Sequence, residues 1–226
     1  SQIASHRSDR LFPAPCGHDL LPLCRDDCSF LRNPCSTREN RGDLGVPTPP
    51  SPGMWVFGYG SLIWNPGFEH SRRVRARLDG WKLRFWQASL DHRGTPEYPG
   101  RVATIIPCPQ SFVWGHAYYL DKDRDAILAY LDHREKGGYE RHNFRLETEE
   151  GELLEALSYV GGQELSTYIG PEDEEETARI IRRAVGPSGA NPDYLRKLYE
   201  SLLHFPYVEP HVVRLLQLVD RNIHSP

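Results

Sequence analysis

The chain has 226 residues, of which 38% are hydrophobic, 11% aromatic and 26% charged, a composition typical of a globular protein and unlike that of a disordered chain. Because 31 acidic residues outnumber 27 basic ones, the net charge of -4 gives no general attraction to nucleic acid or anionic lipid, and no apolar run approaches the roughly 20 residues of a membrane-spanning helix. We therefore expect a small-molecule partner, no nucleic-acid or membrane partner, and a monomer or weak homodimer.

The first 53 residues differ in composition from the rest of the chain. They end in the proline-rich stretch GVPTPPSPG and hold four of the five cysteines, with spacings that match none of the short pairs typical of zinc sites. The sole methionine, Met54, directly precedes the first strand-like run. We expect residues 1–53 to be a disordered or non-native extension and the functional protein to start at Met54. Because Cys108 is the only cysteine after this extension, we expect a reducing, cytosolic location.

Strand-like segments dominate from Met54 onward. Each is rich in Val, Ile, Phe, Tyr or Trp and is bounded by glycine, proline or charged turns. One helix is expected at 123–134, ended by Gly137 and Gly138, and the stretch EEGE at 149–152 predicts a hairpin turn. The expected strands are 55–59, 74–78 with 81–88, 102–107, 112–120, 142–147 and 153–160.

Helices follow the strands. In GPEDEEETARIIRRAVG the acidic residues precede the arginines, as the helix dipole favours, and Gly186 follows the expected end, so the acidic run predicts a helix start rather than a metal site. In NPDYLRKLYESLLHF, Asn191 is expected as the N-cap and Pro192 as the first helical residue, and PHVVRLLQLVDRNI predicts a third helix. Strands first and helices later predict an α+β domain around a mostly antiparallel sheet or small barrel.

The stretch VFGYGSLIW, residues 56–64, places two glycines around a tyrosine before a serine. It lacks the lysine of a phosphate-binding loop, the third glycine of a dinucleotide fingerprint and the flanking glycines of a hydrolase nucleophile elbow. Gly58 and Gly60 are free to adopt positive φ, which would direct amide N–H groups toward a carboxylate or carbonyl oxygen. The Ser61 hydroxyl would add a hydrogen bond and the Tyr59 ring a wall. The alternative is a turn that only lets two backbones approach each other.

The stretch YLDHREKGGYE, residues 130–140, places Glu135 where a predicted helix ends. A carboxylate at the negative end of a helix dipole has a raised pKa, and burial raises that pKa further. A raised carboxylate is what a general base near neutral pH requires. The alternative is an exposed glutamate that pairs with Arg134 or Lys136.

The stretch DHRGTPEYPGRVATI, residues 91–105, predicts a polar loop between two strands. Arg93 and Arg101 would clamp a substrate carboxylate with two hydrogen bonds, or they would pair with Asp91 or Glu97 in a surface turn. His92 beside Asp91 is no evidence for a catalytic dyad, because neighbours on a strand point to opposite faces.

Six stretches, taken in order, resemble the ChaC family of γ-glutamylcyclotransferases, the glutathione-specific enzymes. They are MWVFGYGSLIW, RFWQASLDHRGTPEYPGRVATI, VWGHAYYL, YLDHREKGGY, YIGP and GPSGANPDYL. The uninterrupted REKGGY is most similar to the shorter animal paralogue, and the resemblance covers residues 54–219. It implies a small mixed β-barrel with flanking helices, the γ-glutamylcyclotransferase-like fold, as the domain at 54–219, and leaves 220–226 as a C-terminal tail.

The resemblance also implies a reaction. Glutathione is cleaved to 5-oxoproline and Cys-Gly without a metal or organic cofactor, because the γ-glutamyl amine attacks its own γ-carbonyl. Glu135 corresponds to the catalytic glutamate of the family. The substrate-binding loop corresponds to Val56, Phe57, Gly58, Tyr59, Gly60 and Ser61.

Two features depart from the family pattern or leave it open. The stretch YIGPEDEEET is more acidic than the proline-rich form usual after that tyrosine, and a further acidic residue of some members corresponds to Asp121, Asp123 or Asp125. The alternatives to a glutathione-specific enzyme are a cyclotransferase for other γ-glutamyl amino acids or amines, and a catalytically silent γ-glutamyl-binding protein.

Overall fold

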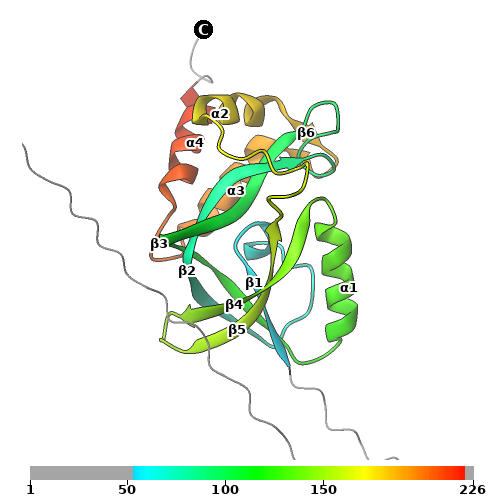
Figure 1. The fold of residues 1–226 in the computed structure, drawn as a ribbon, viewed down its shortest axis with the longest axis vertical. Helices are drawn as coiled ribbons and strands as arrows, with labels where there is room; N and C mark the ends of the chain where they lie inside the picture. Colours follow the sequence, from blue (N-terminus) through cyan, green and yellow to red (C-terminus); the bar gives the residue numbers. More distant parts are fainter. Residues whose placement is uncertain (1–52, 222–226) are drawn as a thin grey trace, which may run out of the picture. The chain divides into compact units, whose positions relative to one another are not determined.

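A closed barrel of five strands forms the centre of residues 53–221, which are the residues that the computed structural model describes (Figure 1). The strand order around the barrel is β1-β3-β2-β4-β5, with β1 antiparallel to β3 and parallel to β5. The prediction of an α+β fold with a small mixed barrel is therefore confirmed. The elements are β1 (Met54–Gly58), η1, a short 3₁₀ helix (Ser61–Ile63), β2 (Arg72–Ser89), β3 (Gly100–Leu120), α1 (Arg124–Glu135), β4 (Tyr139–Thr148), β5 (Leu153–Gly161), α2 (Glu174–Arg183), β6 (Val185–Gly186), β7 (Gly189–Ala190), α3 (Asn191–Leu202) and α4 (Pro210–Arg221).

The long β2–β3 hairpin corrects the expected strand boundaries. Four separate segments were predicted, but β2 and β3 are continuous and pair with each other along most of their length. At the expected break in β2, Gly80 adopts a φ of 81° and the pairing register shifts between Asp79 and Trp81. This bulge absorbs the turn-like residues without ending the strand, because a bulge bends a strand and leaves the ladder intact on either side.

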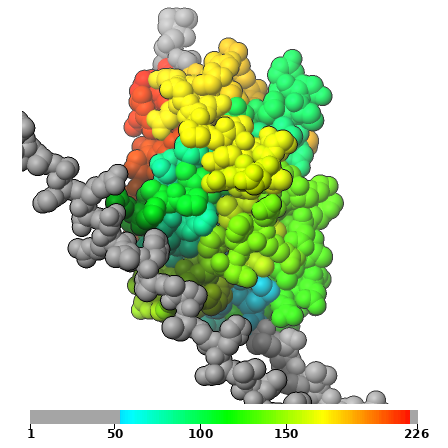
Figure 2. Space-filling model, in the orientation of Figure 1, coloured from blue at the N-terminus to red at the C-terminus, as the bar shows by residue number. Residues whose placement is uncertain are grey.

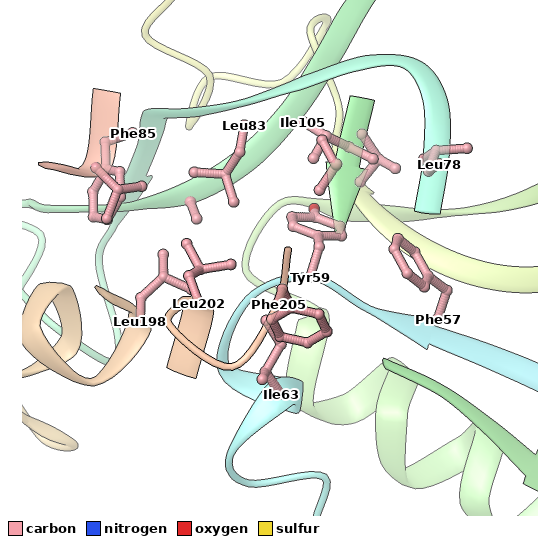
Figure 3. Close-up of a cluster of buried hydrophobic side chains, with 14 of the residues drawn as sticks. Phe57, Tyr59, Ile63, Leu78, Leu83, Phe85, Ile105, Leu198, Leu202 and Phe205 are labelled. Carbon is pink, nitrogen blue, oxygen red and sulfur yellow. The ribbon is translucent and has the colours of Figure 1, made fainter. Parts of the chain in front are cut away.

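The hydrophobic residues form two clusters on opposite sides of the barrel wall. Successive side chains of β1 point to opposite faces of the strand. Phe57 therefore belongs to the cluster inside the barrel, and Val56 belongs to the cluster under α1. Figure 3 shows the inner cluster, in which Leu198 of α3 lies with Leu83 of β2. The outer cluster includes Leu131 of α1, which is fully buried. Both clusters hold the end of β1 in place, because β1 contributes to each.

The helices cover different parts of the barrel. In Figure 2, α1 (bright green) and the pair α2 and α4 (gold and red) occupy separate parts of the visible face, with the yellow segment before α2 between them. The side chain of Asp173 accepts hydrogen bonds from the amides of Glu175 and Glu176, at 3.0 and 3.2 Å. The acidic run is thus a capped helix start, as predicted. No helix within residues 53–221 has the length and apolar character needed to cross a bilayer.

The start of α3 differs from the prediction. Asn191 is not an N-cap, because the helix includes it and no side chain caps this end. Its side chain is completely buried and pairs with the backbone of Arg101 instead, accepting from the amide N–H at 2.7 Å and donating to the carbonyl at 2.8 Å. These two bonds attach α3 to the start of β3, a partner that local sequence does not reveal.

The expected extension lies outside the described residues, apart from Gly53, and so do its four cysteines. The helix α4 continues to Arg221, and the rest of the expected tail also lies outside them.

We predict that Asn191→Ala lowers the free energy of unfolding by about 2–4 kcal/mol, because it leaves a buried N–H and a buried carbonyl of Arg101 without partners. Urea denaturation monitored by circular dichroism measures this change. The matched control is Asn143→Ala at an exposed position of β4, where the expected change is within about 0.5 kcal/mol. Equal effects of the two substitutions would contradict the role assigned to Asn191.

Candidate active site

Two adjoining cavities lie where the end of β1, the end of α1 and the start of β4 come together. The larger has a volume of about 290 Å³ and the smaller about 40 Å³. Four of the lining residues are common to both cavities: Ser61, Glu135, Tyr139 and Tyr194. Groups from η1, α1, β4 and α3 therefore meet at one point, although they are far apart in the sequence.

The end of α1 places Glu135 at this junction. Glu135 is the last residue of α1, and the chain then turns into β4 through Gly137 and Gly138. Gly138 has a φ of 118°, and a Cβ atom there would collide with the hydroxyl of Thr167, so the turn requires glycine. The predicted helix end is confirmed.

The Glu135 side chain is only 16% exposed, and its Oε1 lies 3.3 Å from the Arg134 Nε. The pairing with Arg134 agrees with the alternative prediction of a surface ion pair. The side chain is mostly buried, however, and that alternative required an exposed glutamate. Burial raises the pKa of Glu135, and the charge of Asp91 adds to this effect, whereas Arg134 and His92 oppose it. The pKa remains above its ordinary value, in the direction that a general base requires.

Arg134 connects Glu135 to the segment after β1. Its Nη2 donates to the Ser61 hydroxyl at 2.8 Å, and its Nη1 donates to the carbonyls of Asn65 at 2.8 Å and Pro66 at 3.0 Å. One guanidinium thus holds the carboxylate and the serine at a common cavity wall.

The two glycines of the β1–η1 segment do not have the predicted backbone. Neither adopts positive φ, and Gly60 has a φ of -114°. A Cβ atom on Gly58 would collide with the Leu62 Cβ, so glycine is needed there for close packing in a tight turn. The expected nest built from two left-handed glycines is wrong, although Gly58 and Gly60 both line the smaller cavity.

The other residues of the expected substrate loop divide between the cavity and the core. Phe57, Tyr59 and Ser61 line the smaller cavity, whereas Val56 is completely buried in the cluster under α1 and lines neither cavity. The Tyr59 hydroxyl donates to the Tyr159 carbonyl at 2.7 Å. Its ring is therefore fixed as a wall.

Tyr59, Tyr139 and Tyr194 line the smaller cavity together with Glu135; Tyr59 and Tyr194 are buried, and Tyr139 is half-buried. Burial raises the pKa of Tyr59, Tyr139 and Tyr194, and the nearby Glu135 adds to each shift, so their hydroxyls stay neutral near pH 7. The Tyr139 hydroxyl donates to the Ala103 carbonyl at 2.8 Å. The Tyr194 hydroxyl accepts from the Ala103 amide at 3.3 Å, which leaves its own hydrogen available to an acceptor in the cavity.

The predicted polar loop lies partly at the cleft. Asp91, His92 and Arg93 line the larger cavity, whereas Arg101 does not. Arg101 instead forms a two-point ion pair with Glu172, at 2.9 and 2.8 Å. Arg101 is therefore a structural residue. The surface-turn alternative expected it to pair with Asp91 or Glu97, but its partner is Glu172.

Arg134, Tyr139 and Tyr194 were not among the site residues expected from the sequence. Tyr139 ends the stretch REKGGY, and Tyr194 is the second-to-last residue of GPSGANPDYL; both stretches carry the resemblance, and this was the available signal. None of the acidic candidates Asp121, Asp123 and Asp125 lines either cavity, whereas Asp91 lines the larger one. Within residues 53–221, no three His, Cys, Asp or Glu side chains are grouped so as to hold a metal ion.

The chain is similar in sequence and in fold to known proteins. A family model described as "ChaC-like protein" matches residues 54–222. The chain is 35% identical over 205 residues to the glutathione-specific gamma-glutamylcyclotransferase of Saccharomyces cerevisiae, covering 70% of this chain and 88% of that protein. It is 37% identical over 154 residues to human glutathione-specific gamma-glutamylcyclotransferase 1, covering 66% of this chain and 69% of that protein. A crystal structure of a yeast gamma-glutamyl cyclotransferase specific to glutathione superposes with a TM-score of 0.71 at 30% identity, covering 76% of this chain and 97% of that one.

We predict a pH-dependent effect of Glu135→Gln on stability. Because the folded state raises the pKa of Glu135, the stabilising contribution of its protonated form is fully present below the unfolded pKa and is lost as the pH rises through the folded pKa. Glutamine does not titrate. The variant should therefore gain stability relative to the wild type between about pH 4 and about pH 7.5. Urea denaturation at both pH values measures the difference in unfolding free energy. A variant that loses stability relative to the wild type as the pH rises would contradict the raised pKa.

Proposed function

Because this chain belongs to the ChaC family, we propose that it is a glutathione-specific γ-glutamylcyclotransferase, an enzyme that cleaves glutathione to 5-oxoproline and Cys-Gly. The printed names of its yeast and human relatives support the substrate, and the yeast structure at 30% identity supports a shared barrel.

One observation carries the proposal. Glu135 lies at the junction of two cavities, mostly buried and with a raised pKa, and an arginine joins it to the β1–η1 segment. A site for intramolecular cyclisation needs a base and a surface that folds the substrate, and it needs no nucleophilic side chain. This arrangement supplies both requirements.

The first step forms the new bond. Glu135 removes a proton from the α-ammonium group of the γ-glutamyl residue, and the amine nitrogen attacks the γ-carbonyl carbon of the same residue. The five-membered ring closes, and negative charge develops on the carbonyl oxygen. Hydrogen-bond donors at the cavity wall, including the Tyr194 hydroxyl, stabilise this charge because they are fixed beforehand.

The second step breaks the peptide bond. The carbonyl forms again, the bond to the cysteine nitrogen breaks, and protonated Glu135 gives its proton to the departing amine. The ring nitrogen then loses its second proton, which the freed amine of Cys-Gly takes up. The products are 5-oxoproline and Cys-Gly, and Glu135 is again ionised. Gly58, Gly60 and Ser61 hold the γ-glutamyl end in this scheme, with Phe57 and Tyr59 as walls.

We propose three further properties of the protein. The catalytic domain is residues 54–219, supported by the family match to 54–222. The protein is a monomer or weak homodimer. Its location is cytosolic, supported by the single free cysteine, Cys108, among the described residues.

The first functional prediction concerns turnover. The purified protein should release 5-oxoproline from glutathione but not from γ-glutamyl-alanine, and Glu135→Gln should lower kcat by roughly 10²- to 10⁴-fold because the general base is lost. Mass spectrometry of 5-oxoproline measures both. The matched control is Glu140→Gln, at an exposed position that lines neither cavity, which should retain full activity.

Other outcomes would select other functions. Turnover of γ-glutamyl-alanine alone would indicate a cyclotransferase for other γ-glutamyl compounds. Absence of 5-oxoproline, together with a rise in melting temperature on adding glutathione, would indicate a binding protein. Full activity of Glu135→Gln would show that another group is the base.

The second functional prediction concerns the extension. Deleting residues 1–53 should leave the melting temperature and the turnover of glutathione nearly unchanged, because the described residues that line both cavities and form both hydrophobic clusters all follow Gly53. A thermal melt and the same 5-oxoproline assay test this. A large loss in either would assign the extension to the folded enzyme.

A further inference from the structure

The guanidinium of Arg93 faces the larger cavity with most of its hydrogen-bonding capacity unused. Arg93 lies in the loop between β2 and β3 and is half-buried. Its Nη1 donates to the Ala190 carbonyl at 3.2 Å, and its Cζ lies 5.8 Å from the centre of the Tyr194 ring. Among the described residues, this guanidinium has no other hydrogen-bond partner and no acidic partner. An arginine with a free edge in a cavity is well suited to bind a carboxylate.

The other basic side chains that line the cavity, Arg134 and His92, already have hydrogen-bond partners. Arg134 uses both of its terminal nitrogens to hold the segment after β1, and its Nε lies beside Glu135. His92 Nδ1 is paired with the Ser188 hydroxyl at 3.0 Å. Among the described residues that line the cavity, Arg93 is therefore the cation left for a ligand.

The position of Arg93 indicates which end of the substrate it meets. Arg93 lines the larger cavity and does not line the smaller one, which the β1–η1 segment bounds. If the γ-glutamyl end lies against that segment with its amide at Glu135, the rest of the peptide extends into the larger cavity. The far end of glutathione is the carboxylate of its glycine.

We propose that Arg93 binds the glycine carboxylate of glutathione and thereby selects this tripeptide over γ-glutamyl compounds without a carboxylate at that distance. This inference rests on the proposed function and adds a specificity-determining residue to it.

The Arg93 loop is held in position by its own contacts. The Arg93 amide donates to the Ser89 hydroxyl at 2.9 Å, and the Ser188 amide donates to the His92 carbonyl at 2.9 Å. The second bond attaches the loop to the turn between β6 and β7. Because the loop is held in one conformation before a ligand binds, the entropic cost of ordering it on binding is smaller.

Two substrates that differ only at the glycine carboxylate test this inference. The wild type should have a kcat/KM roughly 10- to 100-fold higher for glutathione than for its glycine monoethyl ester, because a charged hydrogen-bonded pair is lost with the ester. Arg93→Gln should lose about the same factor on glutathione, mainly through KM, and little on the ester. Arg93→Lys should retain part of the preference for glutathione over the ester, since lysine keeps the positive charge but cannot donate two parallel hydrogen bonds to a carboxylate.

The matched control is Arg179→Gln, which removes an arginine that pairs with Glu176 on α2 and lines neither cavity. Its preference for glutathione should equal that of the wild type. Melting temperatures of all variants identify any loss of folding, and if Arg93→Gln does not fold, the comparison is made with Arg93→Lys.

Two results would overturn the inference and leave the proposed function intact. They are a wild type that turns over glutathione and its ester equally, and an Arg93→Gln variant that loses the same factor on both. If the wild type releases no 5-oxoproline, the proposed function fails, and calorimetric binding then decides the role of Arg93. Glutathione binding that is roughly tenfold weaker in Arg93→Gln would support that role, and equal or absent binding would overturn it.

Discussion

The hydrogen bonds of Arg134 are the constraint on which the rest of this site depends. They join the last turn of α1 to the segment after β1, two parts of the chain separated by about 70 residues. Buried Leu131 holds α1 against the outside of the barrel, and Phe57 holds β1 from the inside. The guanidinium then sets the separation between Glu135 and Ser61. A base and a substrate-binding turn can share a cavity only if this separation is fixed.

The apolar surroundings of the cavity control its proton chemistry. Burial raises the pKa of Glu135, and it keeps the hydroxyls of Tyr139 and Tyr194 neutral. Neutral hydroxyls beside an ionisable carboxylate act as hydrogen-bond donors and do not compete with it for protons. Burial in the same barrel core that stabilises the fold therefore shifts the pKa of Glu135, the proposed base, and keeps the neighbouring tyrosines protonated.

The residues proposed for chemistry and for recognition lie on different parts of the fold. Glu135 and the tyrosines belong to α1, β1, β4 and α3 or directly follow them, whereas Arg93 belongs to the loop between β2 and β3. Residues on packed elements keep a fixed geometry, and loops vary more readily without loss of the core. A change of substrate could therefore arise in this loop with the catalytic arrangement unchanged.

The sequence predicted which regions form strands and helices, the α+β class, the helix end at Glu135 and, through the order of its motifs, the family, because periodicity and turns are local properties. It did not predict that β2 and β3 are each continuous, because their long-range pairing carries them through the turn-like residues. Tertiary structure alone decided three features. Asn191 binds the backbone of Arg101, 90 residues away, although its local position resembles a cap. Gly58 is needed for its contact with Leu62 and not for positive φ. Tyr139 and Tyr194 reach the same cavity as Glu135 only when the barrel closes and α3 docks on it. Pairing between distant segments depends on how the whole chain packs, and no local pattern encodes it.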